Sequence, residues 1–258
     1  MRLMKRILSA AAVLALSASL LVGCSSGTAS SVPVSASSAA ESTVSSVEET
    51  ASSAVDENEA AAAQLLNDLT GSYQELWPVI LADEYKQTWL DDCTALVGED
   101  NAEAAFEKLS SMVTGDVYGE DAVKAYANGG GAYFCGFTNS LAILTFDGET
   151  STISGTDKDG SVLFSHTYHY IGMEPVRGLY EFQSNDADSG EFTYFFLAPD
   201  TSAETYHIEF RYGSDAEALS QYDTGEYAYW LASGISTDCD QTMIDNCIEL
   251  FCTENLAG

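Results

Sequence analysis

The sequence is poor in basic residues, with 9 lysines and arginines against 40 aspartates and glutamates and a formal net charge of −31. A surface this acidic repels phosphate backbones and anionic lipid headgroups, so nucleic acid is not expected as a partner. After residue 22 the chain also lacks any apolar run near the roughly 20 residues that cross a membrane. No transmembrane helix is therefore expected in that part.

The chain also lacks the signatures of common catalytic sites. It has no Ser-His-Asp or Cys-His motif, no phosphate-binding loop and no pair of carboxylates that can be assigned to acid–base catalysis. It has no CxxC pair, which argues against a redox motif or a thiolate zinc knuckle. We therefore do not expect an enzyme.

The N-terminus has the layout of a secretory signal. Three basic residues, Arg2, Lys5 and Arg6, precede an apolar run over 7–22. The run ends in Leu-Val-Gly-Cys at 21–24, which resembles the lipobox of bacterial lipoproteins, where the chain is cut before the cysteine and the thiol is lipidated. We expect 1–23 to be removed and Cys24 to anchor the protein outside the cytoplasm at the bacterial cell membrane. Two acyl chains hold a protein there without a spanning helix.

Residues 24–59 are predicted to form a disordered tether. They consist mainly of Ser, Ala, Thr, Val and Glu and contain no aromatic residue. Such a segment cannot bury enough apolar surface to offset its conformational entropy. The remaining part, 60–258, has the size of one domain.

Cysteine pairing stays open at the sequence level. If Cys24 is lipidated, an oxidising compartment permits disulfides among the others, but an odd number leaves at least one thiol unpaired. The five are Cys93, Cys135, Cys239, Cys247 and Cys252.

Hydrophobic periodicity divides the domain into a helical and a β part. Helical spacing predicts helices over 60–69, 72–81, 85–97 and 102–113, a short turn over 215–221 and a closing helix over 238–252. Between them a period of two predicts strands over 132–137, 141–146, 150–154, 162–171, 176–182, 191–197 and 206–212. Tight turns between the strands indicate an antiparallel meander barrel, so the fold is mainly β with helices before and after the barrel.

Four stretches carry a family resemblance: 69–78 (LTGSYQELWP), 168–172 (YHYIG), 192–199 (FTYFFLAP) and 207–215 (HIEFRYGSD). In order and spacing they resemble the ZinT/YodA zinc-binding proteins, whose module also forms the C-terminal half of AdcA-type zinc-uptake lipoproteins. The resemblance implies a lipocalin-like (calycin) barrel and a first stretch that forms an N-terminal helix. It also implies binding of zinc or another divalent metal, and a metal-uptake transporter component as a partner.

The family holds zinc with three histidines. Aligned on the motifs, these positions fall on Phe195, His207 and Glu209, so one histidine is kept, one is replaced by a carboxylate and one by an aromatic ring. Residues i and i+2 of a strand share a face, so His207 and Glu209 would point the same way. Imidazole nitrogen and carboxylate oxygen both bind zinc, which makes these two residues the predicted metal ligands.

Two side chains are too few for tight zinc binding, since open sites use three protein ligands. The candidates for the third position are Asp200, Glu204, His166 and His169. On a regular strand His166 and His169 face opposite ways and cannot both take part. The predicted function is metal capture or buffering outside the cytoplasm, with delivery to uptake. The alternative is a metal-free calycin domain that binds a small ligand or a protein partner at the cell surface.

Overall fold

The structure is a computed structural model that describes residues 57–199 and 207–257. The predicted signal peptide, Cys24 and most of the tether lie outside these ranges, as do Asp200 and Glu204. None of the helices within these ranges is long and apolar enough to cross a membrane.

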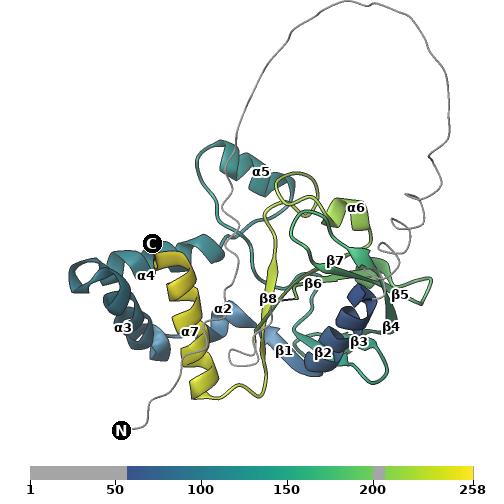
Figure 1. Ribbon diagram of the computed structural model, residues 1–258. Helices are drawn as coiled ribbons and strands as arrows, with labels where there is room; N and C mark the ends of the chain where they lie inside the picture. Colours follow the sequence, from purple (N-terminus) through teal and green to yellow (C-terminus); the bar gives the residue numbers. More distant parts are fainter. Residues whose placement is uncertain (1–56, 200–206, 258) are drawn as a thin grey trace, which may run out of the picture. The chain divides into compact units, whose positions relative to one another are not determined.

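Eight antiparallel strands form a closed barrel (Figure 1). Each strand pairs with the next one along the chain, and β8 closes the barrel by pairing with β1. The strands are β1 (Gly71–Glu75), β2 (Ile143–Asp147), β3 (Thr152–Thr156), β4 (Val162–Met173), β5 (Tyr180–Ser184), β6 (Tyr194–Leu197), β7 (His207–Gly213) and β8 (Ala232–Ser236). The predicted fold class, an antiparallel barrel with helices before and after it, is confirmed.

Helices pack beside the barrel and form a second hydrophobic core. Helix α7 lies against α3 and α4, next to β8 and α2 (Figure 1). Apart from Cys135, the buried residues of this core come from α2, α3, α4, α7 and β8 and include Trp77, Trp89, Leu109, Ile235 and Ile248. The helices are a segment helical over 57–68, α2 (Leu76–Ile80), η1 (Asp83–Tyr85), α3 (Lys86–Val97), α4 (Glu99–Val113), α5 (Glu120–Ala127), η2 (Gly190–Phe192), α6 (Ala216–Leu219) and α7 (Gln241–Leu256).

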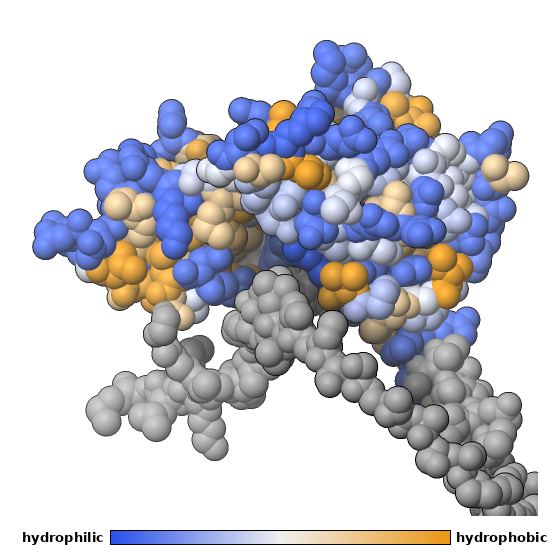
Figure 2. All heavy atoms as spheres, turned by 90° about the horizontal axis from the view of Figure 1, so that it is seen from above, coloured by the Kyte–Doolittle hydropathy of each residue, from blue (hydrophilic) through white to orange (hydrophobic). Residues whose placement is uncertain are grey.

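The face of the molecule seen in Figure 2 is mostly hydrophilic, and its hydrophobic residues lie in groups separated by hydrophilic ones. This agrees with an acidic chain whose apolar residues are collected in the two cores.

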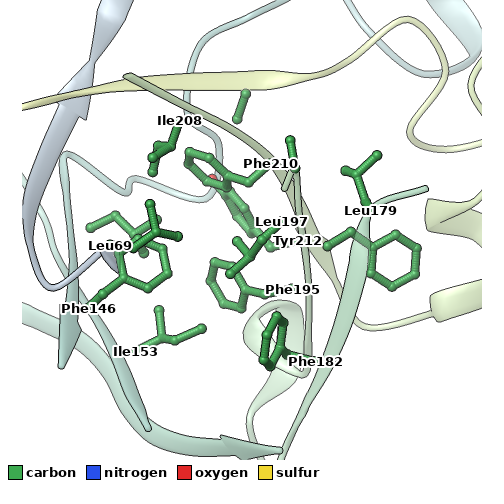
Figure 3. Packing of buried hydrophobic residues seen from close by; sticks show 14 of the residues in the cluster. Leu69, Phe146, Ile153, Leu179, Phe182, Phe195, Leu197, Ile208, Phe210 and Tyr212 are labelled. Carbon is green, nitrogen blue, oxygen red and sulfur yellow. The ribbon is translucent and has the colours of Figure 1, made fainter. Parts of the chain in front are cut away.

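Aromatic and aliphatic side chains fill the barrel. Ile208, Phe210 and Tyr212 of β7 point inward, where they meet Phe195 and Leu197 of β6 (Figure 3). All five are at most 2% exposed. Because successive residues of a strand alternate between faces, the odd-numbered residues of β7 lie on the outer surface of the barrel.

The helix predicted over 72–81 is wrong in its first half. Residues Gly71–Glu75 form strand β1, and only Leu76–Ile80 form a helix, α2. Tyr73 lies opposite Leu144 of β2 and Ser236 of β8, so this short segment joins the two ends of the sheet. Closing the barrel supplies both neighbours of β1, and this tertiary pairing overrides local helical spacing. The first stretch of the resemblance, 69–78, was expected to form an N-terminal helix, and in the structure it contains a strand followed by a helix.

Two further differences concern the segments around this closure. The strand predicted over 132–137 is reduced to isolated bridges of Phe134 with Thr114 and Trp230. Helix α5 and strand β8 were not predicted. The sequence of β8, Ala-Ser-Gly-Ile-Ser, has little β propensity, and its place between β1 and β7 decides its conformation.

Candidate functional site

The two predicted metal ligands lie side by side on the outer face of β7. His207 and Glu209 are both half-buried, on the side of the strand opposite to Phe210 and Tyr212. On β8, Ile235 pairs with His207 and Ser233 pairs with Glu209. The prediction that both side chains share a face therefore holds, and the face is the one that the helices cover, since Ile235 belongs to the helical core.

A row of side chains crosses the strands at Glu209. The backbone amide of Ser233 donates to the carbonyl of Cys135 at 3.0 Å, so the segment around Cys135 runs along the other side of β8. Glu209, Ser233 and Cys135 thus come from three adjacent segments of one sheet surface. Trp77 of α2 and Cys247 of α7 belong to the same buried cluster as Cys135.

The electrostatics of this row follow from its burial. Burial raises the pKa of the Cys135 thiol to about 12, and the carboxylate of Glu209 adds to the increase. Burial also raises the pKa of Cys247 to about 12, with smaller contributions from Cys239, Glu254 and Glu209. A negative carboxylate close to a thiol disfavours the thiolate. Both cysteines are therefore thiols rather than thiolates at neutral pH.

The third position of the resemblance lies on the other side of the sheet. Phe195 is fully buried inside the barrel, with its ring centroid 5.4 Å from those of both Tyr168 and Tyr212. His207 and Glu209 point away from that interior. The three aligned positions do not converge in this structure.

The remaining histidines lie on β4, which β5 and β6 separate from β7. His166 is half-buried, and its Nδ1 is 2.7 Å from Oδ2 of Asp186. His169 is exposed. Their different exposure agrees with the prediction that they face opposite ways, and neither lies near His207. Across 57–199 and 207–257, no three His, Cys, Asp or Glu side chains are placed to hold a metal ion together.

Polar groups at one end of the barrel serve the fold. The Oε1 atom of Glu75 accepts from the backbone N–H of Phe137 at 2.6 Å. The hydroxyl of Tyr212 donates to the carbonyl of Thr138 at 2.9 Å and accepts from its backbone N–H at 2.6 Å. Burial raises the pKa of Tyr212, so this phenol stays protonated. These bonds fix the segment 137–138 across the barrel end.

The sequence reasoning missed Ser233, Cys135 and Cys247 as neighbours of Glu209. Strand alternation predicts which side chains share a face of one strand, but β8 was not predicted. The residues opposite β7 could therefore not be named. Cys247 was placed correctly on the closing helix, although its proximity to Glu209 depends on how α7 docks.

No protein-family model and no curated protein sequence matches the chain. Among solved structures it is similar to the Zn(II)-bound ZinT-like domain of Streptococcus pneumoniae AdcA, with 15% identity and a TM-score of 0.45 over 71% of this chain and 89% of that domain. It is also similar to Zn(II)-bound AdcA from Streptococcus pneumoniae, with 14% identity and a TM-score of 0.43 over 72% of this chain and 35% of that protein. The strand topology described above, and not these likenesses, establishes the fold.

Proposed function

We propose that the protein is an extracytoplasmic lipoprotein that binds a divalent metal ion, with zinc as the main candidate. It would capture or buffer this ion for an uptake system. Cys24 would carry the lipid anchor. His207 and Glu209 would supply two metal ligands from adjacent same-face positions of β7.

The observation that carries the proposal is the shared face of His207 and Glu209. Side chains two residues apart on a strand lie close enough to bind one ion, and β7 is held on both sides by β6 and β8. An imidazole with a carboxylate is harder than a three-histidine site, so it should select zinc less strongly over other divalent ions.

The donor set also limits the strength of binding. Two ligands are fewer than the three of an open zinc site. Weak, exchangeable binding suits buffering or transfer better than permanent retention. The alternative of a small ligand within the barrel gains no support from the interior, which aromatic side chains such as Phe195, Phe210 and Tyr212 fill.

The test is a calorimetric zinc titration of the chain from residue 25 onward after treatment with a chelator. Replacing even outer-shell partners of metal ligands costs about 10–100-fold in affinity, so His207→Ala and Glu209→Gln should each weaken binding by at least about tenfold. His169→Ala, an exposed histidine on β4, is the matched control and should bind as the unaltered chain does.

Two results would contradict the proposal. One is the absence of heat together with an unchanged melting temperature on addition of zinc. The other is binding that His207→Ala and Glu209→Gln leave intact, which would place the metal elsewhere.

A further inference from the structure

Two cysteines meet at the centre of the helical core. The Sγ atom of Cys93 in α3 lies 3.9 Å from the Sγ atom of Cys252 in α7. Both residues are fully buried. They are 159 positions apart in the sequence, and α3 and α7 lie side by side in Figure 1.

We propose that Cys93 and Cys252 form a disulfide that fastens the C-terminal helix α7 to α3. A disulfide bond is about 2.05 Å long, so the two sulfur atoms must approach by roughly 1.9 Å, a distance within reach of small side-chain and helix adjustments. Disulfides form and persist outside the cytoplasm. The inference shares that location with the proposed function but is independent of metal binding.

The oxidant is a disulfide of the oxidising compartment, carried by a thiol–disulfide exchange protein or a small thiol. The thiolate of one cysteine attacks this disulfide and forms a mixed disulfide, and one thiolate of the oxidant leaves. The thiolate of the second cysteine then attacks the protein sulfur of the mixed disulfide and releases the second oxidant thiolate. Two protein thiols become one disulfide, and the oxidant takes up the two electrons and two protons as two thiols.

Burial sets the order of folding and oxidation. It raises the pKa of both Cys93 and Cys252, so neither thiol ionises readily once α7 is docked. The thiolate is the reactive form, and an external oxidant cannot reach sulfur atoms that have no exposed surface. Oxidation therefore precedes or accompanies the docking of α7, and the finished bridge resists reduction in the folded protein.

The other three cysteines of the described residues take no part in this pairing. Cys135 lies in the row at Glu209, Cys247 of α7 lies in the same buried cluster, and Cys239 is half-buried just before α7. With one bridge between Cys93 and Cys252, the structure leaves these three as thiols.

Peptide mapping of the full chain, recovered after export, tests the pairing directly. The protein is denatured without reductant, its thiols are alkylated, and it is digested with trypsin and a protease that cleaves after glutamate. Cys93 then lies in the peptide 87–99 and Cys252 in 250–254, while Cys239 and Cys247 share 227–249 and Cys135 lies in 125–149. The expected result is a linked pair of 87–99 and 250–254 that disappears after reduction. Alkylated Cys93 and Cys252, even after refolding with oxidised glutathione, would overturn the proposal, and so would a link from either peptide to another one.

Thermal unfolding provides a second, independent readout. A disulfide that closes a long loop stabilises the folded state, so reduction in denaturant followed by refolding should lower the melting temperature by roughly 5–15 °C. The matched control Cys239→Ala should show the same drop, and Cys252→Ala should show none. An equal melting temperature for oxidised and reduced unaltered protein would contradict a stabilising bridge. If Cys252→Ala does not fold, the peptide map of the unaltered chain still decides.

Discussion

The guanidinium of Arg211 lies 4.3 Å from the centroid of the Tyr222 ring and is fully buried on the outside of the barrel. Its Nη atoms donate to the carbonyls of Leu219, Gln221 and Tyr227, all in the segment that follows β7. One side chain of the barrel wall therefore fixes the path of the chain between α6 and β8.

Arg211→Lys should destabilise the protein without changing zinc binding. A lysine keeps the charge but cannot reach three carbonyls with one ammonium group, which leaves buried acceptors unpaired at a cost of about 2–3 kcal/mol. The melting temperature should fall by roughly 4–10 °C. Arg177→Lys is the control, because the guanidinium of Arg177 also lies over Tyr222, at 4.5 Å, but its side chain is exposed. A similar loss in both variants would mean that the carbonyl contacts of Arg211 carry little stability.

Phe195→His tests the orientation of the third aligned position. The substitution restores the residue type that the family resemblance implies, but it places an imidazole among Tyr168, Tyr212 and other rings inside the barrel. The loss of packing and the burial of a polar group should cost about 2–4 kcal/mol. Calorimetry should show no gain in zinc affinity, since the new ring faces away from His207. Tighter zinc binding by this variant would show that Phe195 and His207 reach a common site.

Most strands of the barrel could be predicted from the sequence, but the two strands that close it could not. Alternating patterns gave six of the eight strands, because residues such as Phe210 and Tyr212 need the interior while their neighbours do not. Strands β1 and β8 were not predicted, because their sequences show little alternation of polar and apolar residues and their pairing with each other decides their structure. The periodicity of apolar residues predicts the conformation of a segment only where that segment has one buried and one exposed face.

The candidate site shows the same limit. The shared face of His207 and Glu209 follows from their spacing alone and was predicted. The neighbours Ser233, Cys135 and Cys247 come from three other segments, and only the register of β8 and the docking of α7 bring them close. The proximity of Cys93 and Cys252 has the same origin, since the sequence placed each in a predicted helix but could not show how the two helices pack.

Gly155→Ala should be strongly destabilising for steric reasons. A Cβ atom at Gly155 in β3 would lie 2.4 Å from Cδ1 of Leu141 and 2.4 Å from a ring carbon of Phe164. Both belong to the barrel core, so relief requires repacking at a cost of about 1–3 kcal/mol. Gly172→Ala in β4 is the control, because its Cβ would meet nothing closer than 4.0 Å. Urea unfolding should give a lower midpoint for Gly155→Ala only, and equal midpoints would show that the core has room at β3.

Asp92→Asn should raise stability at neutral pH and have little effect in acid. Asp92 lines a groove between α3 and α7 together with Asp91, Asp245 and Glu249. Burial raises its pKa, and the carboxylates of Glu249, Asp245 and Asp91 add to the increase. A raised pKa means that the folded protein binds this proton more tightly than the unfolded chain does. The stability contributed by protonated Asp92 is therefore present in acid and is lost as the pH rises from the ordinary aspartate value, about 3.9, through the raised one.

An amide at this position stays neutral at every pH and removes that loss. Because the side chain is only partly buried and solvent screens its neighbours, we expect a modest gain of about 1–3 °C in melting temperature at pH 7. The gain should shrink at higher salt, as the repulsion from Glu249 and Asp245 is screened. It should vanish well below the ordinary aspartate pKa of about 3.9, where the carboxyl is protonated in both states. Glu107→Gln, an exposed carboxylate on α4, serves as the control for a general reduction of negative charge. If both variants gain equally at pH 7, the net charge of the chain, and not the groove between α3 and α7, sets this part of its stability.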